Sequence, residues 1–377
     1  MKMGNLEVLI ERLLDLEGAL KRVELGVFPR RTQRKAVEYI IFLLRNLRSS
    51  LEPLSSSPSA SISSLIEKGY ELLQAICNIA EKIERSNVHY TPLGAVYLAE
   101  YLAGKVGEGI IPIICFQSSS SSCARLSDLL KITAPLLPLE CRKLKEDVVF
   151  FTLPYFLKND PLSHCLIARE LALHLIETKG LLKEALTKAS SPHQLLTIAA
   201  DRLATLMVGP AYLFSLLNIN FSSSGREERI QSIVHLLVDE GYYEKKALRH
   251  ILPSLAEARP PAGVEYLCEM EERFKKTAAY YSSETFESEV PQLVSRLLDL
   301  LPPNEVTSPD MATRPAEVPS IINAGWVVKQ HHMSAFYKIL KAQKPEEKYH
   351  ARRKLDALIE KAIELSVIHK SLLEAEI

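Results

Sequence analysis

Two side chains that could do chemistry stand one helical turn apart in residues 168–174. Glu170 and His174 are separated by four positions, and Asp201 follows later in the chain. Residues four apart lie on the same face of a helix, so this carboxylate and imidazole can meet. With Asp201 they offer the oxygen and nitrogen donors of a metal site. The alternative, which we favour because polar pairs at this spacing are common, is a hydrogen-bonded pair on the helix surface.

Other reactive residue types lack partners at a useful spacing. His331 and His332 have no Cys or acidic residue at ligand spacing, so we expect an exposed pair. Cys165 follows His164 directly, but adjacent helical residues point about 100° apart, so the imidazole is poorly placed as its base. We expect Cys165 in the core. The serine run at 118–122 lacks the glycines of a nucleophile elbow and predicts a loop, and no Gly-rich phosphate loop is present.

The first hundred residues are predicted to be helical from the spacing of their apolar residues. Apolar residues recur at steps of three and four in residues 6–20 and 65–83, although Gly69 interrupts the second stripe. Residues 37–44 predict a largely buried helix. The stretch 55–64, rich in Ser and Pro, predicts a loop.

The predicted secondary structure changes from helices to strands near Gly107. Residues 110–116 and 148–152 are β-branched and aromatic and predict two strands, and Pro112 places the first of them at a sheet edge. Helices are predicted over the ranges 162–178, 193–206, 230–237 and 245–251. Gly180 should end the first of these helices, and Gly209 with Pro210 should break the second.

Two segments near the C-terminus have distinct sequence patterns. Residues 302–319 are rich in Pro, Ser and Thr and predict a linker. The last helix has a narrow seam suited to one partner helix, with residues at alternating steps of three and four: Leu355, Leu358, Ala362, Leu365, His369 and Leu372.

Four short elements stand in a fixed order in residues 149–217, and a fifth follows later in the chain. They are Leu153-Pro154 after a strand, the run 168–174 (Ala-Arg-Glu-Leu-Ala-Leu-His), Thr197-Ile198-Ala199-Ala200-Asp201, Gly209-Pro210-Ala211-Tyr212 and Ile322-Asn323-Ala324-Gly325-Trp326. In order and spacing they resemble a zincin-like (zinc metallopeptidase-like) family of microbial proteins. The resemblance covers about half of the chain.

The resemblance implies a zinc site that this chain does not reproduce. In such sites two His at i and i+4 hold zinc, the Glu after the first His takes a proton from metal-bound water, and a later helix gives a third ligand. The corresponding positions here are Arg169, Leu173 and Thr197. Leu cannot coordinate a metal, and the protonated guanidinium of Arg repels a cation.

The residues that the chain keeps from the implied site predict a pseudoenzyme, a protein that resembles an enzyme but lacks its activity. Glu170, His174 and Asp201 are kept, but a proton acceptor without metal-bound water has no nucleophile to activate. We expect no cofactor, and we expect Arg169 to pair with Glu170 and Asp201 in place of the metal. The alternative is a metal-dependent hydrolase in which Glu170, His174 and Asp201 hold zinc in an altered site.

Composition limits the partners and the compartment. The chain has 46 Lys and Arg against 46 Asp and Glu in 377 residues, which removes the surplus of positive charge that drives nucleic-acid binding. A basic cluster, Arg30, Arg31, Arg34 and Lys35, has Glu-containing segments on both sides, so we expect a solvated turn rather than a nucleic-acid surface. Six scattered cysteines, a charged N-terminus and the lack of a bilayer-length apolar run predict a cytoplasmic protein without a membrane segment.

These observations combine into one expectation. The fold should be mainly α with a small β element, a zincin-like helical core flanked by N- and C-terminal helices. The predicted regions are an N-terminal helical region (1–106), the degenerate core (107–240) and a C-terminal helical region (241–377). We expect a non-catalytic structural or protein-interaction module, with a protein partner or a second copy meeting the seam of the last helix.

Overall fold

The computed structural model describes residues 2–53, 62–107, 109–117, 122–133, 147–219, 225–244, 264–308 and 310–375. The chain forms two compact units. Unit 1 contains Met1–Pro92 and Glu108–Tyr155, and unit 2 contains Leu93–Gly107 and Phe156–Ile377. Residues of the predicted region 107–240 thus occur in both units, and the three-region division stays a prediction.

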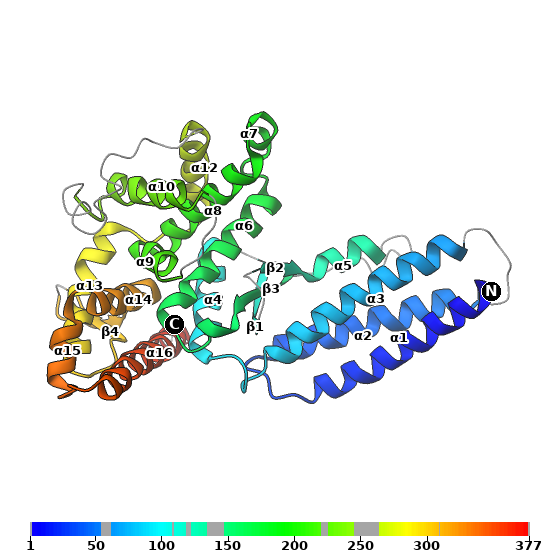
Figure 1. Ribbon diagram of the computed structural model, residues 1–377, viewed down its shortest axis with the longest axis horizontal. Helices are drawn as coiled ribbons and strands as arrows, with labels where there is room; N and C mark the ends of the chain where they lie inside the picture. The colour runs from blue at the N-terminus through cyan, green and yellow to red at the C-terminus, as the bar shows by residue number, and fades with distance from the viewer. Residues whose placement is uncertain are drawn as a thin grey trace. The chain divides into compact units, whose positions relative to one another are not determined.

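Unit 1 is built on three long helices, α1 (Lys2–Glu24), α2 (Arg31–Leu51) and α3 (Ile62–Arg85), which lie side by side (Figure 1). Their apolar stripes meet in a core that includes Leu9, Leu13, Ile40 and Ile76. Gly69 interrupts the apolar stripe of α3 at a point where a larger residue does not fit. A β-carbon at this position would lie 2.5 Å from Leu9 Cδ2. The glycine therefore permits the close approach of α1 and α3.

A three-stranded sheet completes unit 1. The strands β1 (Ile110–Gln117), β2 (Ser122–Arg125) and β3 (Asp147–Pro154) have the order β1-β3-β2, with β1 parallel and β2 antiparallel to β3. Both predicted strands are confirmed, and β1 with Pro112 lies at the predicted edge. Ser122 opens β2 instead of ending a loop, while residues 118–121 lie outside the described residues. The short helix α5 (Leu126–Thr133) follows β2 directly.

Unit 2 is helical. Its longer elements are α4 (Leu93–Val106), the 3-10 segment η4 (Pro161–Leu166), α6 (Ile167–Lys179), α8 (Pro192–Val208), α9 (Pro210–Asn218), α10 (Arg226–Asp239), α12 (Val264–Thr277), α13 (Ser283–Leu298), α14 (Val318–Val327) and α16 (Pro345–Ala375). Its other elements are α7 (Lys183–Lys188), the π-helical turn η6 (Val328–His332) and α15 (Met333–Ile339), and the 3-10 turn η3 (Tyr155–Leu157) includes the last residue of unit 1. Helix α8 lies against both α6 and α10 (Figure 1).

The predicted helix ends are confirmed where glycine sets them. Gly180 caps α6 with φ 60°, and Gly209 separates α8 from α9 with φ 67° and ψ −149°. Residues 162–166 form a 3-10 segment rather than the first turn of the predicted α-helix. The loop prediction at 55–64 is wrong at its end, because α3 begins at Ile62. Residues 55–61 and the predicted helix at 245–251 lie outside the described residues.

The linker prediction for residues 302–319 is wrong. The strands β4 (Glu305–Thr307) and β5 (Thr313–Pro315) pair antiparallel there, and α14 begins at Val318. The reason is local support from α13, since the Gln292 side chain bonds both the N–H and the carbonyl of Thr307.

The seam of the last helix has partners inside the chain over most of its length. Leu355, Leu358 and Ala362 on α16 are buried, and α16 packs against α4 and α14. The end of the seam is open, with Leu372 60% exposed.

The fold class is confirmed as mainly α with a small β element. Across the part of the chain that the structure describes, none of the helices combines the length and the apolar character needed to cross a bilayer.

Candidate functional site

Helices α6 and α8 bring the predicted site residues together in unit 2. Glu170 and His174 are buried on α6, and Asp201 on α8 has no exposed surface. The expected surface pair of Glu170 and His174 is wrong in its location, because α4, η4 and α8 all pack against α6 and leave little of it open to solvent. A hydrogen bond between the two side chains stays a prediction.

Asp201 is the centre of a buried ionic cluster. Its Oδ1 accepts a hydrogen bond from the Tyr212 hydroxyl at 2.5 Å, and its two oxygens accept from Arg229 Nε at 2.6 Å and Nη2 at 3.0 Å. Arg169 Nε lies 3.3 Å from Asp201 Oδ1, while Arg169 Nη1 donates to Glu170 Oε1 at 3.0 Å. We call these five residues the Asp201 cluster. The predicted pairing of Arg169 with Glu170 and Asp201 is confirmed.

The protonation states in the Asp201 cluster follow from burial and from the carboxylates. Burial raises the pKa of Tyr212 well above its ordinary value, and the negative charge of Asp201 raises it further, so the phenol keeps its proton. Burial lowers the pKa of both guanidinium groups, but their partners outweigh that effect, so the pKa values of Arg169 (beside Tyr212, Asp201 and Glu170) and Arg229 (beside Asp201 and Tyr212) are raised overall. Two positive charges therefore balance two carboxylates in this interior.

The side chains at the predicted ligand positions are not metal ligands. Thr197 is half-buried, and its hydroxyl donates to the His193 carbonyl of the same helix at 2.9 Å. Leu173 is also half-buried and has no donor atom. The position of the first ligand carries the Arg169 guanidinium, which occupies the carboxylates that a cation would use.

The residues kept from the implied site do not fit zinc either. Among the described residues, no group of three or more His, Cys, Asp and Glu side chains is arranged to hold a metal ion. Asp201 already accepts hydrogen bonds from Tyr212 and Arg229 and faces a second guanidinium. Two fixed positive charges oppose a dication at this carboxylate. Glu170 and Asp201 therefore form part of an ion-pair network.

Two members of the Asp201 cluster were missed by the sequence analysis as functional partners. Tyr212 belongs to the Gly-Pro-Ala-Tyr element, which was a usable signal for its involvement. Arg229 lies in the first turns of α10, in a charged segment. Nothing in the sequence of this segment indicates that the Arg229 side chain points into the protein interior.

The two C-terminal motif elements hold α9 in place. The Asn323 Oδ1 accepts a hydrogen bond from the Ala211 N–H at 2.9 Å, and its Nδ2 donates to the Val208 and Pro319 carbonyls, both at 2.8 Å. Asn323 thus satisfies backbone groups at the break between α8 and α9, where Gly209 adopts a positive φ. A β-carbon at Gly209 would also lie 2.8 Å from the Tyr281 ring. The motif elements therefore place Tyr212 against Asp201.

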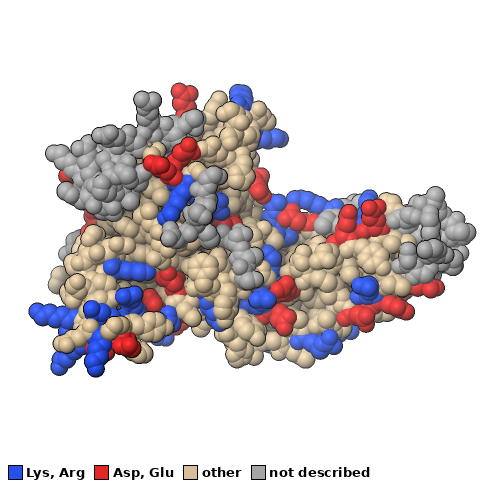
Figure 2. All heavy atoms as spheres, in the orientation of Figure 1, with Lys and Arg blue, Asp and Glu red and all other residues tan. Residues whose placement is uncertain are grey.

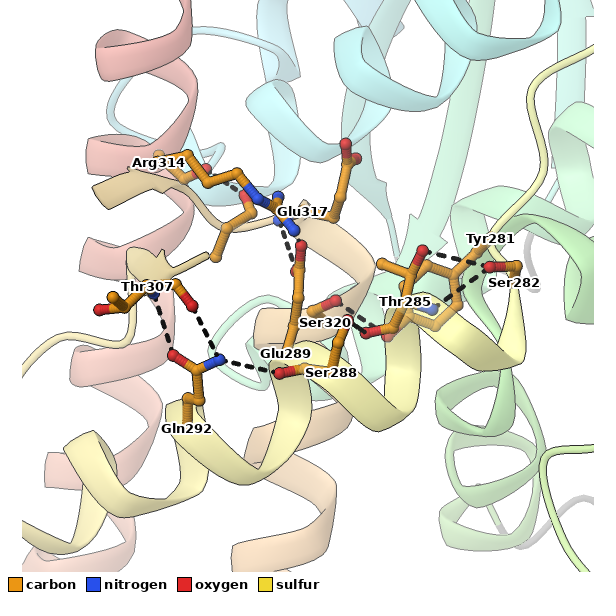
Figure 3. A network of polar contacts seen from close by, with 12 residues as sticks. Tyr281, Ser282, Thr285, Ser288, Glu289, Gln292, Thr307, Arg314, Glu317 and Ser320 are labelled. Carbon is orange, nitrogen blue, oxygen red and sulfur yellow. Dashed lines mark hydrogen bonds and ion pairs between the residues drawn. The ribbon is translucent and has the colours of Figure 1, made fainter. Parts of the chain in front are cut away.

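A second polar network fixes α14, which carries Asn323. Figure 3 shows it between α13 and the β4–β5 hairpin. The buried Glu289 accepts a hydrogen bond from the Glu317 N–H at 3.0 Å and pairs with Arg314 at 2.7 Å. The hydroxyls of Tyr281 and Ser320 lie 2.9 Å apart. These contacts hold the start of α14 and so support the placement of Asn323.

The other reactive residues give no sign of catalysis. Cys165 is fully buried beside Ser215, and burial raises the pKa of its thiol to about 12, so it stays protonated. Burial lowers the pKa of His164, whose Nε2 lies 3.1 Å from the Leu157 carbonyl. The expected core position of Cys165 is confirmed. His331, in the π-helical turn η6, is exposed, and His332 is half-buried.

Comparison of the chain with family models, with curated proteins and with solved structures gave no match. The resemblance to zincin-like proteins therefore rests on the motif elements alone.

Proposed function

We propose that this protein is a non-catalytic, degenerate metallopeptidase-like protein that acts as a structural or protein-interaction module. The observation that carries the proposal is the pairing of Arg169 with Asp201 and Glu170. A guanidinium stands at the position of the first zinc ligand, and the carboxylates of the implied site neutralise it. This arrangement supports a stable core without metal-bound water.

The zincin-like part of the proposal has a direct test by restoring the ligands. The triple variant Arg169→His, Leu173→His and Thr197→Glu recreates two His at i and i+4 with an acidic third ligand on the following helix, while Glu170 is retained. We expect the restored protein to bind stoichiometric zinc and the wild type to bind none. A correctly folded triple variant without zinc affinity would contradict the resemblance.

The non-catalytic part is tested on the wild-type protein alone, purified without a His-tag. We expect metal analysis to show no stoichiometric metal, and we expect no chelator-sensitive cleavage of an unstructured protein such as casein. A stoichiometric metal that is lost in Glu170→Ala, together with peptide-bond cleavage abolished by a chelator, would establish the hydrolase instead.

The interaction part of the proposal rests on the open end of α16. Ile368, Leu372 and Leu373 are 44%, 60% and 42% exposed, beyond the part of the seam that α4 and α14 cover. Exposed apolar side chains in succession are typical of a contact surface. We expect Leu372→Asp to abolish self-association in light scattering or capture of a protein partner, whereas Glu374→Gln at the same helix end leaves both unchanged. Retained association in Leu372→Asp would place the interaction elsewhere.

A further inference from the structure

A strongly basic surface lies on unit 2, over α15 and the beginning of α16. Residues 329–354 contain eight Lys and Arg but two acidic residues, Glu346 and Glu347, whereas the whole chain has a net charge of zero. In Figure 2, Lys and Arg side chains gather where Figure 1 places α15 and the start of α16. We call this the α15–α16 basic surface, defined by Lys338, Lys341, Lys344, Lys348, Arg352 and Lys354.

The positive charges of this surface are available to a partner. Lys338, Lys341, Lys344 and Lys354 are exposed, and none of them forms an ion pair within the described part of the chain. The carboxylate of Glu347 accepts hydrogen bonds from the Gln343 and Lys344 N–H groups at 2.8 and 3.0 Å, and so it stabilises the backbone at the start of α16. Glu347 therefore bonds the backbone and not the side chains of these lysines, and the eight cations of residues 329–354 outnumber the two carboxylates.

Aromatic rings alternate with these cations. Lys348 Nζ lies 5.8 Å from the centre of the Tyr337 ring, and Arg352 Nε donates to the Tyr337 hydroxyl at 2.8 Å. Tyr349 is 59% exposed, with its ring 5.7 Å from that of His350. A single-stranded nucleic acid needs this combination, because cations meet its phosphates and flat rings stack on its unpaired bases.

The composition of the surface favours nucleic acid over a lipid bilayer. Of residues 329–354, all of which the structure describes, the exposed large apolar side chains are Ile339 and Tyr349. Membrane-surface helices instead present a continuous apolar face beside their cations. We propose that the α15–α16 basic surface binds single-stranded nucleic acid, with Lys338, Lys341 and Lys344 contacting phosphates and Tyr349 stacking on a base.

The turn predicted for Arg30–Lys35 is wrong, because α2 begins at Arg31, and this cluster at the start of α2 provides a matched control for the proposal. Arg31, Arg34 and Lys35 are three exposed cations on unit 1, so their replacement by Gln removes the same charge as Lys338→Gln, Lys341→Gln and Lys344→Gln. All six side chains are exposed, so both triple variants should fold, which circular dichroism can check. The probes are fluorescent oligouridylate and oligothymidylate of about 16 nucleotides, and fluorescence anisotropy gives the affinity.

We expect the wild type to bind at least one of the two oligonucleotides. The Lys338, Lys341 and Lys344 triple variant should bind at least tenfold more weakly at about 50 mM salt, and its plot of log affinity against log salt should be shallower by roughly 2, which is about 0.7 for each lost phosphate contact. Tyr349→Ala should weaken binding about fivefold or more with an unchanged salt slope. The α2 triple variant should bind as the wild type does.

Three outcomes would overturn the proposal. They are no binding of either oligonucleotide at about 50 mM salt, an equal loss of affinity in the two triple variants, and binding to phosphatidylserine vesicles without binding to either oligonucleotide. A difference between the uridylate and thymidylate probes would assign the ligand to RNA or to DNA.

Discussion

Arg169 and Asp201 form an ion pair that joins helix α6 to helix α8, with 3.3 Å between the guanidinium Nε and the carboxylate Oδ1. Asp201 has no solvent exposure, and its further partners are Arg229 and Tyr212. A buried carboxylate stays ionised at an acceptable free energy only while hydrogen bonds and positive charge surround it. The residue that replaces a metal ligand in the implied site is therefore part of what stabilises unit 2.

Replacement of Arg169 by Met removes one of the two guanidinium groups from the Asp201 cluster. We expect the free energy of unfolding to fall by about 1.5–3 kcal/mol, the usual contribution of a hydrogen bond to a charged group. Arg229 still neutralises Asp201, so the loss should stay below that of a fully unpaired buried charge. Urea denaturation measures it. The control is Arg273→Met, which breaks an exposed pair with Glu269.

The control variant should change the free energy of unfolding by less than about 0.5 kcal/mol, the usual range for surface substitutions. An Arg169→Met variant that also stays within this range would show that the ion pair adds nothing to the fold.

Asp356 on α16 gives the protein a predictable pH dependence. Burial raises the pKa of its carboxyl group to about 6, and repulsion from Asp160 adds to this, against the attraction of Arg353 and Lys329. A carboxyl group with a raised folded-state pKa binds its proton more tightly in the folded chain. Its favourable contribution is therefore complete below the unfolded value of about 3.9 and is lost as the pH rises through about 6.

The variant Asp356→Asn isolates this effect, because an amide keeps the shape and stays neutral. We expect it to be more stable than the wild type by up to about 2 kcal/mol near pH 7.5, with a difference that shrinks toward pH 4. Urea denaturation at the two pH values measures this. An Asn variant that is less stable than the wild type at neutral pH would show that the ionised carboxylate is well accommodated.

Asn323 links the end of α8, the start of α9 and its own helix through three hydrogen bonds. Asn323→Ala leaves the Ala211 N–H and the Val208 carbonyl without this partner in a buried site. We expect a loss of about 2–4 kcal/mol in the free energy of unfolding, since each orphaned buried group costs about 1–3 kcal/mol. The control is Asn218→Ala, whose exposed side chain makes one bond of 3.3 Å to Asp160. Equal stability of the two variants would remove the structural role of Asn323.

The sequence predicts those features that depend on nearby residues. Helices α1 and α3 follow from apolar periodicity, and the edge position of β1 follows from Pro112, which cannot donate a hydrogen bond to a second neighbour. The pairing of Arg169 with Asp201 could be predicted because motif spacing already placed both residues on facing helices.

The features that the sequence does not predict depend on contacts between helices and strands that lie far apart in the sequence. Arg229 reaches Asp201 because α10 lies against α8, and the pattern of α10 does not encode that direction. The strand β2 has four residues without alternation of apolar and polar types, so its order comes from pairing with β3. The sequence does not predict the basic surface because its lysines are spread over two helices and a turn, while the whole chain has a net charge of zero.

Two glycines in unit 2 should respond to the same substitution with opposite signs. A β-carbon at Gly325 on α14 would lie 2.5 Å from Leu162 Cδ2 and 2.8 Å from Ile359 Cδ1, whereas one at Gly104 on α4 meets nothing within 4 Å. Leu162 and Ile359 are fully buried, so they cannot move into solvent, and overpacking costs about 1–3 kcal/mol. Gly104 is exposed in a helix, where Ala is favoured over Gly by about 0.5–1 kcal/mol. We therefore expect thermal and urea unfolding to show Gly325→Ala destabilised and Gly104→Ala stabilised, and stabilisation by both would mean that α14 does not pack against η4 and α16 as closely as described.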